Sequence, residues 1–249
     1  MLVLTPLLIG ILGAVLASFA GVISERLNTG ESWMRGRSRC NACDRFLTAL
    51  DLVPVLSWVI ARGGCRTCRA SIPYRYALAE VLLAVVFAAA AAMLGLGVSL
   101  VLALAFFFLL LIIVLYDLRH TIVPLPLAFV LIGLAVLFLL TTTHGMSALA
   151  VTLLGAGAIG TGFFLMHVLS RGRWMGLGDA PIALALSLFV GSQALAGLLF
   201  SFWIGGAIGI LILVATPKGH RMGIEVPFVP FLAAGYLLAF FTQWNPLPF

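Results

Sequence analysis

Two aspartates stand at the ends of long apolar runs. Asp117 closes the run LALAFFFLLLIIVLYD, and Asp179 follows the glycines of GLGD and opens another. A carboxylate at the C-terminal end of a helix opposes the helix dipole, and burial near a bilayer adds a further cost. Two simpler explanations stay open: Asp117 could pair with Arg119 or His120 in the headgroup region, and Asp179 could cap the helix that it begins.

A meeting of the two carboxylates would create acid–base chemistry. Two negative charges about 4 Å apart at an effective dielectric near 20 repel by about 4 kcal/mol, so the pair would share one proton and titrate as a unit. The base could activate water while the acid polarises a peptide carbonyl, which is the logic of an aspartic protease. Gly176 and Gly178 would let a substrate strand or a neighbouring helix approach the backbone closely.

All four cysteines of the chain lie in two Cys-x2-Cys pairs, Cys40 with Cys43 and Cys65 with Cys68. Two such pairs can place four thiolates tetrahedrally around a zinc ion. Four protein ligands leave no open position, so we expect a structural zinc. Two disulfides are the alternative, but a segment on the reducing side of a membrane disfavours them.

The composition requires a membrane. Of 249 residues, 63% are hydrophobic and 9% are charged, and long apolar runs without a two-residue alternation indicate spanning helices. We expect an all-α polytopic membrane protein of about eight spans, at residues 2–23, 78–95, 98–116, 124–141, 148–169, 179–191, 194–215 and 227–243. The sixth is short, so it is tilted, thins the membrane locally, or is buried among its neighbours.

The basic residues predict the orientation. With both termini outside, all 14 lysines and arginines fall in the inside segments, which are 24–77, 117–123, 170–178 and 216–226. Basic loops beside anionic lipids explain the net charge of +6 without a nucleic-acid partner. We expect a first transmembrane helix over 1–23, a small cytoplasmic, zinc-ribbon-like domain over 24–77, and a seven-helix membrane domain over 78–249.

The remaining polar residues have ordinary interpretations. Asp51 is expected to pair at the surface of the small domain, and Glu80 to lie in the first turn of the second span, where the helix dipole favours it. The histidines have no ligand spacing and are interpreted as interfacial; they are His120, His144, His167 and His220.

The motifs together resemble the type IV prepilin peptidases. The similarity covers about residues 18–235, and it includes GLGD, YDLRHTIVP, the paired CxxC motifs, LVPVLSWVIARGGC, IPYRYALAE and VPFVPFLAAG. The resemblance implies a GxGD-type intramembrane aspartyl protease with Asp117 and Asp179 as the catalytic pair.

The same resemblance implies a substrate and a location. The substrate would be a precursor of a type IV pilin, or of a type II secretion pseudopilin, cut before its hydrophobic segment on the cytoplasmic side of the inner membrane. Many members also methylate the new N-terminus with S-adenosylmethionine, an activity associated with the loop that binds zinc. Membrane lipids are the other expected partners, and the sequence leaves the oligomeric state open.

Two other classes of protein fit part of the pattern. A proton-coupled transporter would use membrane aspartates as a relay, but it predicts a polar path through the outer halves of the spans, where the sequence has no charge. A non-catalytic pilin-assembly protein would keep the scaffold and would not need both aspartates.

Overall fold

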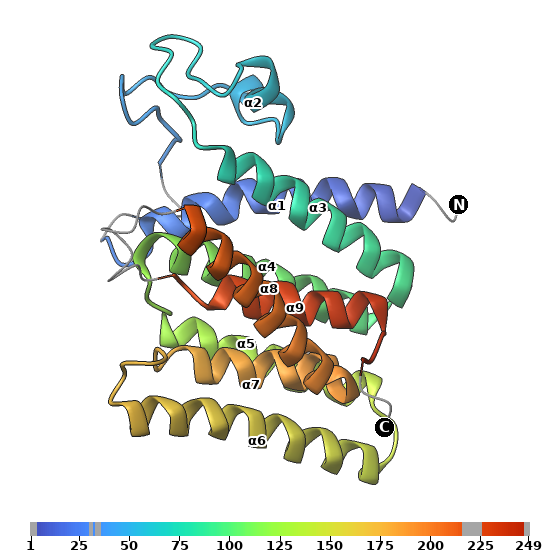
Figure 1. Ribbon diagram of the computed structural model, residues 1–249. Coiled ribbons are helices and arrows are strands. Elements are labelled where there is room, and N and C mark those ends of the chain that lie inside the picture. The colour runs from blue at the N-terminus through green and yellow to red at the C-terminus, as the bar shows by residue number, and fades with distance from the viewer. Residues whose placement is uncertain (1–3, 30–31, 33–35, 216–225, 247–249) are drawn as a thin grey trace. The chain divides into compact units, whose positions relative to one another are not determined.

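The computed structural model describes residues 4–29, 32, 36–215 and 226–246, so Lys218 and Arg221 of the predicted last inside loop lie outside the described residues. The chain divides into two compact units, Met1–Leu100 and Val101–Phe249. Helices make up nearly all of the regular structure in the described part, and no strand occurs there apart from two isolated bridges. The elements, coloured along the chain in Figure 1, are α1 (Leu4–Arg26), η1 (Ala49–Asp51), α2 (Leu56–Ile60), α3 (Tyr74–Leu94), α4 (Val98–His120), α5 (Leu125–Thr142), α6 (Met146–Ser170), α7 (Asp179–Val190), η2 (Gly191–Gln193), α8 (Ala194–Ala215) and α9 (Val229–Thr242).

In the first unit, α1 and α3 pack along each other. Gly13 of α1 makes this approach possible, since a Cβ there would lie 2.7 Å from the carbonyl oxygen of Leu83. Near the zinc-ribbon-like segment, the Tyr76 hydroxyl of α3 donates a hydrogen bond to the Glu25 carboxylate of α1. The cysteine-bearing segment therefore starts and ends on two helices that are packed together.

In the second unit, α7 is the most enclosed helix. It contacts α5, α6, α8 and α9, and nine of its twelve residues are buried. A helix of twelve residues is about 18 Å long, well short of a hydrocarbon core of about 30 Å. Of the three explanations for a short sixth span, the structure supports burial among its neighbours.

Phe189 anchors the C-terminal end of α7. Its ring stacks on Phe106 of α4 at a centroid distance of 4.1 Å and on Phe138 of α5 at 4.3 Å. Phe240 of α9 lies 5.1 Å away. The same helix is held further by a buried hydrogen bond of 2.8 Å between the Ser187 and Tyr236 hydroxyls. Three other helices therefore fix α7 at the end opposite Asp179.

The predicted all-helical membrane fold is confirmed, with a difference in the spans. Each of the eight predicted segments coincides with a helix, α1 or one of α3 to α9. Six of the described helical segments are long and apolar enough to cross a membrane, with Asp179–Ala215 counted as one. Val229–Thr242 is apolar but shorter. The count of eight crossings stays a prediction, because α7 and α9, with 12 and 14 residues, are shorter than the roughly 20 residues of a full crossing.

Candidate active site

Asp117 lies in the last turn of α4. Its side chain is buried, with 4% exposure, between the apolar body of the helix and the start of α9, where the backbone of Val229 approaches the carboxylate. Its Oδ2 atom has no hydrogen-bond partner among the described residues. A buried acceptor without a partner costs about 1–3 kcal/mol, so this oxygen lowers the stability of the fold.

Asp179 is the first residue of α7 and has 8% exposure. The N-cap position belongs to Gly178, and no side chain caps this helix. The Asp179 carboxylate instead turns back toward the preceding loop, where Oδ2 accepts the backbone N–H of Gly176 at 3.1 Å. The capping explanation of Asp179 is therefore wrong for this side chain.

The two aspartates come together in the second unit. Asp117 and Asp179 lie close enough to interact electrostatically, although 61 positions separate them in sequence. Asp117 lies at the C-terminal end of α4 and Asp179 at the N-terminal end of α7, as the predicted topology requires. Their catalytic role stays a prediction.

Gly178 allows this meeting. A Cβ at position 178 would lie 2.4 Å from Cβ of Val123, in the loop that follows Asp117. Its φ of −69° is an ordinary value, so this position needs glycine for close approach and not for backbone freedom. A Cβ at Gly176 would lie 3.4 Å from Oδ2 of Asp179, an ordinary contact. The two predicted active-site glycines therefore have different roles.

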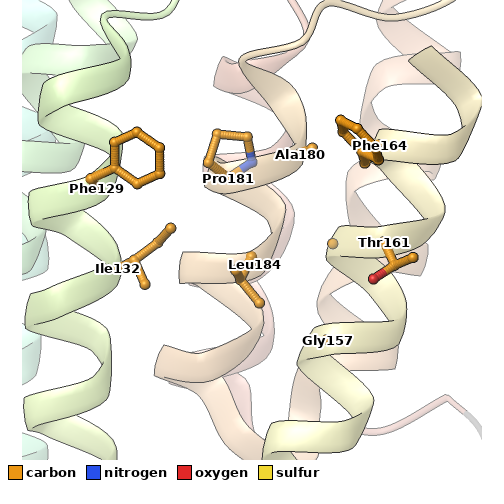
Figure 2. Close-up of a pocket in the computed structure, with 9 residues that line it drawn as sticks. Phe129, Ile132, Gly157, Thr161, Phe164, Ala180, Pro181 and Leu184 are labelled. Atoms are coloured by element: carbon orange, nitrogen blue, oxygen red, sulfur yellow. The ribbon is translucent and has the colours of Figure 1, made fainter. Parts of the chain in front are cut away.

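An apolar pocket lies beside Ala180, Pro181 and Leu184 of α7 (Figure 2). It has a volume of about 310 Å³ and is shallow and largely open. Three helices line it, with side chains and backbone of Phe129, Ile132, Gly157, Gly160, Thr161, Phe164, Ala180, Pro181 and Leu184. The two residues directly after the carboxylate thus begin a groove suited to a hydrophobic segment.

The four cysteines form a candidate metal centre in the first unit. All four Sγ atoms lie within 4.8 Å of one another, and those of Cys40 and Cys68 are 3.7 Å apart. Tetrahedral zinc with sulfur ligands at about 2.3 Å requires sulfur–sulfur distances of about 3.8 Å. The four thiols are free of disulfides, so the donor set fits a metal ion.

The two cysteine pairs have the same backbone geometry. The N–H of Cys40 donates to the Arg45 carbonyl and that of Cys65 to the Ala70 carbonyl, both at 2.9 Å. The residue after each pair has a positive φ, 53° at Asp44 and 59° at Arg69. The backbone N–H groups of Cys68 and Thr67 lower the pKa of the Cys65 thiol to about 6. Against the backbone N–H of Arg45, the neighbouring Cys68 sulfur raises the pKa of Cys43 to about 11, so without a metal the four thiols do not ionise alike.

Asp51 joins the two cysteine pairs, a role that the sequence interpretation missed. Its carboxylate contacts Arg45 at 2.8 Å and Arg66 at 3.2 Å, one arginine beside each pair. It also accepts the backbone N–H and the hydroxyl of Thr48 at 3.0 and 2.9 Å. The Thr48 N–H, with the neighbouring arginines, lowers the pKa of Asp51 below its usual range. Surface pairing is therefore an incomplete description of this residue.

Glu80 was also misplaced. The helix begins at Tyr74, so Glu80 lies in its second turn and not its first. The buried carboxylate accepts the N–H of Val55 at 2.6 Å. Val55 has a φ of 61°, a strained value for a β-branched residue, and the bond to Glu80 holds it there.

Comparison with known proteins decides the family. Residues 11–94 match the bacterial Peptidase A24 N-terminal domain, and residues 104–214 match the type IV leader peptidase family. The chain belongs to the type IV leader peptidase family. The resemblance predicted from the motifs is confirmed, and both candidate aspartates fall in the second matched region.

Relatives in this family carry a common name. A prepilin leader peptidase/N-methyltransferase of Bacillus subtilis is 32% identical, over 92% of this chain and 91% of the relative. One of Aeromonas hydrophila is 33% identical over 84% and 74%. One of Myxococcus xanthus is 34% identical over 84% of this chain, which covers only 63% of that relative. No solved structure matches the chain.

Proposed function

We propose that this leader peptidase family member is a membrane-embedded aspartyl endopeptidase that removes the leader from type IV prepilin or pseudopilin precursors. The observation that carries the proposal is the meeting of two buried carboxylates, Asp117 and Asp179, one of which has an oxygen without a hydrogen-bond partner in the described part of the chain. Family and relatives support a role in type IV prepilin processing.

The two carboxyl groups would share one proton, because two like charges at short range cannot both ionise cheaply. The ionised member takes a proton from water as the water oxygen attacks the carbonyl carbon of the scissile peptide. The protonated member donates its proton to the carbonyl oxygen. The tetrahedral intermediate then collapses: the carboxyl group that took the water proton passes it to the leaving nitrogen, the other carboxylate takes a proton from a hydroxyl of the intermediate, and the carbon–nitrogen bond breaks. Asp117 and Asp179 can exchange these roles, since the proton belongs to the pair.

The pocket after Asp179 supports an apolar substrate. A precursor segment bound with its scissile bond at the aspartates could continue along α7 over Ala180 and Pro181. The open side would admit a helix from the membrane. This arrangement would place the hydrophobic part of a precursor in the pocket and its polar leader at the membrane surface.

The cysteine cluster would hold a structural zinc, with Cys40, Cys43, Cys65 and Cys68 as ligands. The metal would fix the fold of a small segment that has little core of its own. We retain the division into 1–23, 24–77 and 78–249, with the zinc domain and the aspartates on the cytoplasmic side of the inner membrane, where the positive loops predict them. Methylation of the new N-terminus by S-adenosylmethionine would follow cleavage in a bifunctional enzyme, as the names of the relatives suggest.

Co-expression with a type IV prepilin precursor tests the proposal. Leader removal is followed by gel mobility and mass spectrometry for the wild type, Asp117→Asn and Asp179→Asn, with membrane levels matched by immunoblot. We expect cleavage by the wild type and none by either variant. The mass of the mature product also reports whether a methyl group is added. Full cleavage by either variant would refute the aspartate pair, whereas absence of cleavage by the wild type would favour an assembly or transport role.

A further inference from the structure

We propose that His167 is a positioning residue for Asp179, and that it acts through the peptide group that joins Met175 to Gly176. The inference rests on the proposed function and concerns the same site. It revises the interpretation of His167 as an interfacial residue.

The geometry is a chain of two hydrogen bonds. His167 lies in the last turn of α6, and its Nδ1 atom is 2.9 Å from the carbonyl oxygen of Met175. A carbonyl oxygen can only accept, so Nδ1 carries the proton and donates it. The N–H of Gly176, on the other side of the same peptide bond, donates to Oδ2 of Asp179 at 3.1 Å.

One rigid unit therefore lies between imidazole and carboxylate. The peptide bond is planar, so the direction of the Met175 carbonyl also fixes the direction of the Gly176 N–H. A donor on the carbonyl oxygen polarises the amide and strengthens its N–H as a donor. His167 thus sets both the orientation and the strength of the one protein hydrogen bond found on the Asp179 carboxylate among the described residues.

The surrounding loop holds the imidazole in place. The Gly172 N–H donates to the His167 carbonyl at 2.9 Å, and the ring lies against Gly172, where a Cβ would be 3.3 Å from Cε1. The buried Ser170 hydroxyl accepts the N–H of Trp174 at 3.2 Å. The imidazole also lies near enough to Asp179 to interact with it electrostatically. The end of α6 therefore contacts and orders the loop that precedes Asp179.

Three substitutions separate positioning from simple support of the fold. Asn places a side-chain N–H the same number of bonds from Cα as Nδ1, Gln places it one bond further, and Phe keeps an aromatic ring without a donor. The assay measures kcat and KM for cleavage of a purified precursor in detergent, with the melting temperature of each variant. We expect His167→Phe and His167→Gln to lower kcat roughly 5- to 10-fold with KM unchanged, the effect of one lost hydrogen bond, and His167→Asn to keep most of kcat.

Matched variants make the outcomes distinct. His144→Phe changes an exposed histidine in the loop between α5 and α6 and is expected to behave as wild type. Asp179→Asn in the same assay reports the proposed function. Wild-type kcat in His167→Phe, with Asp179→Asn inactive, would overturn the positioning role alone. Equal losses in all three His167 variants, tracking a lower melting temperature, would also overturn it in favour of a structural role. Absence of cleavage by the wild type would remove the proposed function, and this inference with it.

Discussion

Replacement of Gly178 by alanine tests the geometry of the site with one methyl group. The new Cβ would stand 2.4 Å from Cβ of Val123, whereas carbon atoms pack at about 3.5–4.0 Å. The loop before Asp179 and the loop after Asp117 would have to separate by about 1 Å or more. A misplacement of this size in a catalytic site can cost about 100-fold in rate.

The assay is precursor cleavage, measured as kcat with equal amounts of folded enzyme in membranes. We expect Gly178→Ala to lose about 100-fold, and Gly176→Ala to lose little, because its Cβ would meet Oδ2 of Asp179 at an ordinary 3.4 Å. Val123→Gly removes the Cβ that clashes and should restore most of the activity of Gly178→Ala. Val123→Ala keeps that Cβ and should not.

The double variants make the reasoning refutable. Full activity of Gly178→Ala would show that the two loops need not be in close contact. If Val123→Gly fails to restore the activity of Gly178→Ala, the close approach to Val123 is not the reason for glycine at position 178. A melting temperature close to that of wild type separates both results from unfolding.

Three further predictions concern the rest of the molecule. Asp51→Asn should destabilise the small domain by only about 1–2 kcal/mol, because the two arginines that contact the carboxylate are partly exposed. It should also speed zinc loss to a chelator, whereas the exposed Asp44→Asn should not. Equal rates of zinc release from the two variants would contradict the role of Asp51 as a link between the cysteine pairs. Gly157→Leu should fill the pocket and raise KM for the precursor several-fold, whereas Gly155→Leu, on the other side of α6 and outside the pocket lining, should leave KM unchanged. No change in either variant would exclude the pocket from substrate binding. Glu80→Ala should lower the free energy of unfolding by about 1–3 kcal/mol, because the N–H of Val55 loses its partner. Glu80→Gln keeps an acceptor for that N–H and should lower stability less; thermal unfolding of both variants measures the difference.

The helices and the cysteine cluster could be predicted because each follows from a local pattern. Long apolar runs form helices in a membrane whatever surrounds them, so α4 and α8 could be predicted directly from their hydrophobic sequences. The Cys-x2-Cys spacing similarly brings two sulfurs together within one turn of chain. The meeting of Asp117 and Asp179 could be proposed from topology, since both stand at the same predicted membrane edge.

Apart from the approach of the two aspartates, the contacts between distant segments could not be predicted. Nothing local to Gly178 indicates that Val123 lies against it, and nothing near Asp51 indicates that its carboxylate contacts an arginine from each cysteine pair. Glu80 was misplaced because the helix begins before its apolar run, at Tyr74. His167 carried no spacing signal, because its partner is a backbone carbonyl and any residue type supplies one.

The position of Asp179 is fixed by contacts at both ends of α7. Phe189 and its aromatic neighbours fix the far end of α7, so the helix cannot shift along its axis without breaking a packed cluster. At the near end, Gly178 closes the loop against Val123, and the His167 hydrogen bond sets the peptide that holds the carboxylate. If Asp179 has the proposed catalytic role, a short helix buried among its neighbours serves it better than a full crossing, because a group on a rigid element can stay within the small tolerance that acid–base chemistry demands.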